Sequence, residues 1–321
     1  MSAHALTALP TSLPAGLPTR LPAGLSIEVA DDWWRRVFDF SDYGALLGLV
    51  QNSLVAAAVL GLVGGLVGVF VMQRDLAFAV HGISELSFAG AAAALLLSVD
   101  VMLGAVLGSV VAAVVIGLLG TRARDRNSII GVLMPFGLGL GVLFLALYPG
   151  RAANKFGLLT GQVVAVDSTR LSVFLVVAAL VVVGLLAMWR PLTFASVDPE
   201  VAAARGVPTR SLGIAFMLLL GLAVALAVQV VGALLVLSLL ITPAAAATRV
   251  SASPVVVPVL SVVFAVTSAV GGILLALGGS VPISPYVTTI SFVIYVVCRL
   301  VGRARTRRGW TRRVTAEAAA A

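Results

Sequence analysis

Two ionisable side chains, His81 and Glu85, lie within an otherwise apolar stretch of this 321-residue sequence. Residues four apart project from one face of a helix, with Cβ atoms about 5–6 Å from each other, so both side chains can reach one ion. An imidazole nitrogen and a carboxylate oxygen are ligands that suit zinc and manganese. Because charged groups inside a membrane are costly, such residues usually face a partner or a water-filled path. The pair therefore predicts a site for a divalent cation.

This pair supplies only two of the three or four protein ligands that zinc usually takes. If two copies of the chain meet along this helix, two His81–Glu85 pairs would together supply four ligands. A transport site must also release its ion, so we expect a transported zinc or manganese ion and no permanently bound cofactor. The structural alternative is that the two side chains only hydrogen-bond each other and hold helices together.

The composition is that of a membrane protein. Hydrophobic residues make up 60% of the chain and charged residues 11%, whereas soluble domains are near half apolar and a quarter charged. The net charge of +8 does not indicate nucleic-acid binding, because the arginines cluster between apolar runs and at the C-terminus, as topology signals do. The single cysteine, Cys298, excludes a disulfide framework and a cysteine-based zinc site. A phosphate-binding P-loop motif is missing, so the chain is not expected to be an enzyme or to hydrolyse ATP itself.

The uncharged runs predict an all-α polytopic membrane protein with nine crossings, eight being the alternative. One crossing takes about 20 apolar residues at about 1.5 Å each. Two long runs, Ser211–Thr248 and Val250–Cys298, each suit two crossings, with breaks near Gln229–Gly232 and Gly278–Pro285. Eight crossings would result if the segment around residues 76–98 were broken or re-entrant. The other spans are expected within Tyr43–Gln73, 76–99, Val101–Thr121, Asn127–Gly150 and Leu171–Trp189.

The basic loops orient these spans and delimit the membrane domain. Arginines at 122–126, 190–210 and 299–313 mark cytoplasmic segments, so the N-terminus is expected outside. The membrane domain then covers residues 43–302. Before it, residues 1–42 form a proline-rich arm with a candidate interfacial helix around Asp31–Gly44, the alternative there being a loop that precedes the membrane. After it, residues 303–321 form a basic cytoplasmic tail.

Glycines are spaced for close contact between helices. The pairs Gly61/Gly65, Gly64/Gly68 and Gly104/Gly108 match the small-xxx-small pattern that lets membrane helices approach each other. They predict a compact bundle.

A short cytoplasmic helix is predicted within residues 198–210. Asp198 is a good N-cap, Pro199 fits the first helical position, and Glu200 favours the positive end of the helix dipole. Gly206 can close the helix in the left-handed conformation, and Pro208 prevents its continuation. The product is a two-turn helix with an alanine face, small enough for the groove of another protein; the alternative is an ordinary connecting helix.

Over roughly residues 45–302 the sequence resembles the zinc- and manganese-uptake permeases of bacterial ABC transporters. That family usually carries an aspartate and then a histidine four residues later in its second span. Here the matching positions hold His81 and Glu85, and Ala89 replaces the proline before Gly90. The segments that carry the resemblance are QNSLVAAAVLGLVGGLVGVFVMQRD (51–75), NSIIGVLMPFGLGLGVLFLAL (127–147), FGLLTGQVVAVD (156–167), DPEVAAARGV (198–207) and VVGALLVLSLLITPAAAATRV (230–250).

The resemblance implies a homodimeric pore in the bacterial plasma membrane, with cytoplasmic ABC ATPase subunits and an external metal-binding protein as partners. Closure of the ATPases would push on residues 198–206, where the coupling positions are Asp198, Glu200, Ala203 and Gly206. The metals implied are zinc first and manganese second, held by His81 and Glu85.

Three rival functions are open at this stage. An ABC permease for a siderophore or cobalamin would have no need of metal ligands inside the membrane. A secondary transporter driven by an ion gradient would use Glu85 as a proton relay. A structural membrane protein without transport would not explain the coupling-like helix. An ATPase gene next to this one would decide against the secondary transporter.

Overall fold

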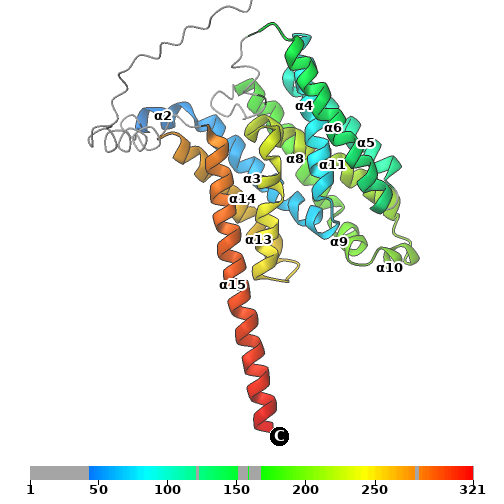
Figure 1. Cartoon of the computed structure of the whole chain (residues 1–321), viewed down its shortest axis with the longest axis vertical. Coiled ribbons are helices and arrows are strands. Elements are labelled where there is room, and N and C mark those ends of the chain that lie inside the picture. Colours follow the sequence, from blue (N-terminus) through cyan, green and yellow to red (C-terminus); the bar gives the residue numbers. More distant parts are fainter. Residues whose placement is uncertain (1–42, 121–122, 151–157, 159–167, 279–281, 321) are drawn as a thin grey trace, which may run out of the picture.

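The computed structural model describes residues 43–120, 123–150, 158, 168–278 and 282–320, and every regular element in these residues is a helix (Figure 1). The expected all-α class is confirmed. The candidate interfacial helix around Asp31–Gly44 and the external segment 156–167 fall almost entirely outside the described residues. The first described element is the short helix α2 (Tyr43–Leu49).

Eight of the described helices are long and apolar enough to cross a membrane. At about 1.5 Å per residue, their apolar lengths of 19–23 residues match a hydrocarbon core of about 30 Å. In α15 only the part Ile283–Ala304 is apolar. The eight helices are α3 (Gln51–Gln73), α4 (Ala77–Leu96), α5 (Val101–Leu119), α6 (Ala123–Leu147), α8 (Ser168–Ala187), α11 (Thr209–Val231), α14 (Val256–Ala276) and α15 (Ile283–Ala320).

A ninth apolar segment follows α11 and is interrupted. Gly232 ends α11 with φ +85° and ψ 158°, a conformation that side-chain-bearing residues rarely adopt. A 3₁₀ turn, η2 (Ala233–Leu235), and a short helix, α12 (Val236–Leu240), come next. The last piece is α13 (Thr242–Val250), with Pro243 in its first turn. The predicted break near Gln229–Gly232 is therefore confirmed.

The other predictions about the breaks have different outcomes. The break near Gly278–Pro285 is also confirmed, since α14 ends at Ala276 and α15 begins at Ile283. The eight-crossing alternative was wrong about its location, because α4 is one continuous helix of 20 residues. The interruption lies instead at residues 232–241, which begin with Gly232 and are followed by Pro243 in the first turn of α13.

One end of the bundle collects the basic loops. Figure 1 shows α9 (Trp189–Val197), α10 (Pro199–Ala204) and the loop after α13 at the end from which the C-terminal part of α15 projects. The positive-inside rule assigns this end to the cytoplasm. Since α11 begins at this end and α13 finishes there, the segment after Gly232 returns across the bundle and makes a ninth, shorter pass.

The helices differ in how much protein covers them. In α3, α4 and α11 about 70% of the apolar window is buried (67%, 72% and 72%), whereas α6, α8 and α15 have about 20% buried (22%, 22% and 17%). The first group therefore forms the core, and the second presents its side chains outward. His81 and Glu85 belong to a core helix.

Glycines set the distance between core helices, as their spacing predicted. A Cβ added at Gly65 would lie 2.5 Å from the Cα of Val262 on α14, and one added at Gly61 would lie 2.6 Å from the Cα of Val266. In the same contact Ser261 Oγ donates a hydrogen bond of 2.7 Å to the Gly65 carbonyl. These backbones are too close to admit any side chain larger than hydrogen.

Candidate functional site

Helix α4 carries His81 and Glu85 into the bundle from its cytoplasmic end. A tight turn precedes the helix, with Asp75 at φ +52°, and a second turn with Ser98 at φ +57° follows it. At about 1.5 Å per residue, His81 lies about 6 Å and Glu85 about 12 Å along α4 from its first residue. The carboxylate is thus nearly halfway through the helix.

Both side chains lie on one face of α4. The distance from His81 Nε2 to Glu85 Oε1 is 3.8 Å, and the side chains are 29% and 5% exposed. A hydrogen bond between a nitrogen and an oxygen is typically 2.7–3.2 Å long, so the two groups are neighbours without a direct hydrogen bond. The alternative that they only hydrogen-bond each other does not match this geometry.

The imidazole of His81 is not fully hydrogen-bonded. His81 Nδ1 is buried and has no hydrogen-bond partner. Buried polar atoms in native proteins nearly always have a partner, so Nδ1 is an unsatisfied atom on a ring whose other nitrogen, Nε2, faces Glu85. Because Glu85 is covered by protein, its carboxylate does not point into the lipid chains.

The pair can hold a cation with little adjustment. Zinc bonds nitrogen and oxygen ligands at about 2.0–2.2 Å, so two ligands in tetrahedral geometry are about 3.4 Å apart. The observed 3.8 Å between His81 Nε2 and Glu85 Oε1 needs only a small side-chain shift. Nowhere in the described part of the chain do three or more His, Cys, Asp or Glu side chains converge, so the pair is not part of a larger cluster of these side chains there.

The serines near the pair, Ser84 and Ser87, donate hydrogen bonds to backbone carbonyls. Ser84 Oγ donates a hydrogen bond of 2.8 Å to the His81 carbonyl of the same helix. Ser87 Oγ donates one of 3.0 Å to the carbonyl of Ala105 on α5. Both hydroxyls therefore stabilise the backbone around the site.

The wall behind Glu85 is a closely packed backbone. A Cβ added at Gly137 of α6 would lie 3.0 Å from the carbonyl carbon of Glu85. Helix α6 can approach this closely only because Gly137 has no side chain. The contact holds α4 in place at the depth where its carboxylate lies.

The short helix predicted at residues 198–206 is present as α10. Asp198 Oδ1 accepts a hydrogen bond of 3.0 Å from the Val201 amide, and Pro199 occupies the first turn. Gly206 has φ +82°, and the Val207 amide donates to the Ala202 carbonyl at 3.0 Å, which closes the helix.

Most residues of α10 are exposed on the surface. Ala202 is fully buried, whereas Glu200, Ala203 and Ala204 are exposed. The helix therefore presents a small surface at the cytoplasmic end, to which Val201 and Pro199 also contribute. Its role as a coupling element stays a prediction.

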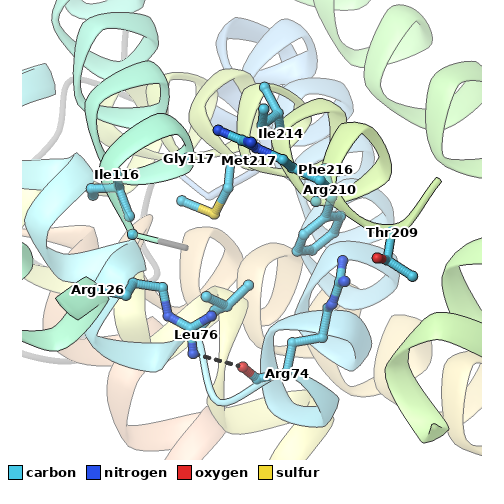
Figure 2. A pocket seen from close by; sticks show the side chains of 12 residues that line it. Arg74, Leu76, Ile116, Gly117, Arg126, Thr209, Arg210, Ile214, Phe216 and Met217 are labelled. Carbon is cyan, nitrogen blue, oxygen red and sulfur yellow. Dashed lines mark hydrogen bonds between the residues drawn. The ribbon is translucent and has the colours of Figure 1, made fainter. Parts of the chain in front are cut away.

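Sequence reasoning missed a basic cavity at the same end. The cavity has a volume of about 520 Å³ and lies between the α3–α4 turn, the end of α5 and the starts of α6 and α11 (Figure 2). The cations lining it are Arg74, Arg126 and Arg210. From the sequence, arginines served only to orient the spans. The signal that could have revealed the cavity is that these three arginines adjoin the ends of different spans on the same side of the membrane.

Two of the arginines in this cavity, Arg74 and Arg126, are close to each other. Arg126 Nη2 donates a long hydrogen bond of 3.4 Å to the Arg74 carbonyl. The guanidinium carbon of Arg74 is 5.7 Å from the centroid of the Phe216 ring, within range of a cation–π contact. Burial and, next, the charge of Arg126 lower the pKa of Arg74 from its usual value.

Asp100, at the outer end of α5, has a structural role. Its Oδ1 accepts a hydrogen bond of 3.0 Å from the Leu103 amide, so it is the N-cap of this helix. Asp167 lies outside the described residues.

Comparison with known proteins identifies relatives among transport proteins. A family model described as the ABC 3 transport family matches residues 47–302. The manganese transport system membrane protein MntC of Halalkalibacterium halodurans is 32% identical over 225 residues, which cover 70% of this chain and 77% of that protein. The high-affinity zinc uptake system membrane protein ZnuB of Haemophilus influenzae is 26% identical over 246 residues, or 76% of this chain and 94% of that protein.

Solved structures share the fold. PsaBC from Streptococcus pneumoniae, determined in complex with Fab, includes a chain with a TM-score of 0.72 and 26% identity, covering 81% of this chain and 95% of that one. A second structure, of a metal-chelate type ABC transporter in an inward-facing conformation, has a TM-score of 0.64 at 18% identity. The latter likeness concerns the fold alone.

Proposed function

The chain belongs to the ABC 3 transport family, and from this membership we propose that it is the membrane permease subunit of an ATP-driven importer for a divalent transition metal. The observation that carries the proposal is the family match over residues 47–302, which contain seven of the eight apolar spans of the described residues and nearly all of the eighth, Ile283–Ala304. The relatives named for manganese and zinc transport support the class of cargo. The protein acts in the bacterial plasma membrane.

The energy for transport comes from partner subunits. The sequence contains no P-loop motif, so ATP is bound and hydrolysed on a separate cytoplasmic ATPase chain. Two copies of the permease form the pore, and an external metal-binding protein delivers the ion. The exposed surface of α10 receives the ATPase, and its movement is transmitted to α11, which follows directly in the chain.

Within the pore, His81 and Glu85 form a transient binding site for the ion. The buried carboxylate supplies charge, and the imidazole supplies a nitrogen ligand. Since the pair gives two ligands, the equivalent pair of the second copy or water completes the coordination. Incomplete coordination favours release, which a transported ion requires.

Zinc is the preferred cargo, ahead of manganese. A nitrogen ligand favours zinc over manganese in the general order of divalent metal affinities, whereas a carboxylate accepts both. Uptake of radioactive zinc and manganese by cells with and without the gene tests this proposal. Loss of zinc uptake on deletion, and its return on complementation, is the expected result.

Two other outcomes would overturn the proposal. Uptake of both metals that does not depend on the gene would exclude a metal importer, and gene-dependent uptake of a siderophore or cobalamin would identify the alternative cargo. Uptake that continues after ATP is depleted, with the ion gradient maintained, would indicate a secondary transporter.

A further inference from the structure

We propose that the cavity lined by Arg74, Arg126 and Arg210 binds a phosphate-bearing anion, namely the headgroup of an anionic phospholipid of the cytoplasmic leaflet. The three residues come from the α3–α4 turn, from α6 and from α11, so the cavity gathers positive charge from three separate parts of the fold. Nothing in the transport route described above uses these side chains.

The positive charge in the cavity is not neutralised by the protein. Across the described ranges, no carboxylate lies within ion-pair distance of any of the three guanidinium groups, the single ion pair there being His81–Glu85. Asp75 acts on Arg126 only at longer range and is exposed. Like charges held together without a counter-charge favour the binding of an anion.

The donors of Arg126 are poorly satisfied. Its Nε is buried without a hydrogen-bond partner, and its Nη2 makes only the 3.4 Å contact with the Arg74 carbonyl. Figure 2 shows these two arginines on either side of Leu76, with Phe216 and Met217 lining another side of the cavity. Guanidinium donors form strong paired hydrogen bonds with phosphate oxygens.

The position and the walls of the cavity favour a lipid. It lies at the end of the bundle that the positive-inside rule assigns to the cytoplasm, where anionic headgroups are found, and basic pockets between helices on this side bind such headgroups. The volume of about 520 Å³ exceeds the need of a free phosphate, and apolar side chains of Leu76, Ile116 and Ile214 share the lining. A glycerol phosphodiester has both a charged and an apolar part and suits this mixture.

A bound headgroup would connect elements that move during transport. Arg210 is in the first turn of α11, six residues after the end of α10, whereas Arg74 and Arg126 belong to the α3–α4 turn and α6. The lipid would thus hold the start of α11 against the helices that support His81 and Glu85. We expect it to stabilise the folded permease.

The test uses the purified full-length chain in nonionic detergent. Thermal unfolding is recorded with added dioleoyl phosphatidylglycerol, dioleoyl phosphatidylcholine or inorganic phosphate, and bound lipid is counted by native mass spectrometry. Arg126→Gln and Arg74→Gln remove one donor group each, and Arg210→Gln serves if either fails to fold. Arg303→Gln is the control, because it removes the same charge from an exposed cytoplasmic position outside the cavity.

The expected result is that phosphatidylglycerol, and not phosphatidylcholine, raises the unfolding temperature of the wild type and of Arg303→Gln. The cavity variants should need at least about tenfold more lipid, as loss of a charge-assisted hydrogen bond implies. If inorganic phosphate alone stabilises the protein and competes with the lipid, the same site is supported, with a free anion as its ligand in place of a lipid headgroup. Equal effects of both lipids, or cavity variants that match the control, would overturn the proposal. So would variants that keep the lipid response in this assay and no longer co-purify with the ATPase from cells that express both chains, which would assign the cavity to a protein contact.

Discussion

Glu85 is a carboxylate enclosed by protein, one helical turn from an imidazole whose Nδ1 has no partner. The sequence predicted that these two residues share a helix face, because residues four apart always do. It could not predict that Glu85 would be buried and His81 partly open, since this depends on how α6 packs against α4 through Gly137. The cation site itself stays a prediction.

Replacing Glu85 with Gln should weaken zinc binding to the purified permease by at least about tenfold. The change keeps the shape of the side chain and removes the charged oxygen ligand, and even indirect partners of metal ligands are worth about 10–100-fold in affinity. Equilibrium dialysis with radioactive zinc measures the effect.

Asp100→Asn is the matched control for this change. It makes the same substitution of amide for acid at an exposed N-cap, where asparagine caps equally well. Equal zinc binding by the two variants would show that Glu85 is not a ligand.

Among the helices, those of the core are held at distances that glycines permit. The glycine pairs were recognisable from their spacing, but which helix each pair meets was not, because the spacing says nothing about the partner. The structure places Gly61 and Gly65 against α14, and Gly104 and Gly108 against α4. Similarly, the sequence predicted a second crossing after the break near Gly232, but not that this crossing would consist of short helices.

Gly65→Ala should destabilise the permease by about 1–3 kcal/mol, as overpacking does. Its new Cβ would lie 2.5 Å from the Cα of Val262, and no side-chain rotation relieves a contact with backbone. Gly139→Ala on α6 is the control, since nothing lies within 4 Å of its added Cβ, and alanine favours a helix over glycine by about 1 kcal/mol. Thermal unfolding in detergent should show a lower midpoint only for Gly65→Ala; equal midpoints would mean that α3 and α14 are not in this close contact.

Ala203→Arg should uncouple ATP hydrolysis from uptake, with uptake at least about tenfold lower and the permease still assembled. Ala203 is exposed on α10, so the fold tolerates the change, while a bulky charge obstructs a partner's groove; a loss of about 1.4 kcal/mol of contact energy already gives tenfold. The measurement compares ATPase activity and zinc uptake in reconstituted vesicles. Val255→Arg, at an exposed position after α13, should remain coupled, and coupling that persists in Ala203→Arg would assign α10 a merely connecting role.

For the molecule as a whole, composition alone predicted an all-α membrane bundle, and arginine positions predicted which end faces the cytoplasm. The sequence left eight passes open at residues 76–98, whereas in the structure that segment is one helix and the interrupted pass is residues 232–250. The basic cavity could not be predicted either, because Arg74, Arg126 and Arg210 are far apart in sequence and meet only when four helix ends converge.

The nine-pass arrangement predicts opposite accessibility of two loops. In a Cys298→Ser background, Val99→Cys lies between α4 and α5 at the outer end, and Ala252→Cys lies in the loop after α13. A membrane-impermeant maleimide should label the first in intact spheroplasts and the second only after permeabilisation. Labelling of Ala252→Cys in intact spheroplasts would mean that residues 232–250 return to the outer face and that the chain crosses eight times.

The central claim is that a divalent metal ion passes through this chain at His81 and Glu85. The initial rate of radioactive zinc uptake tests it most directly, in cells that supply the partner ATPase and binding protein and contain equal amounts of each permease variant. The account predicts that His81→Ala and Glu85→Gln each lower this rate at least about tenfold, while Asp100→Asn keeps it near that of the wild type. Wild-type rates in both His81→Ala and Glu85→Gln would contradict it.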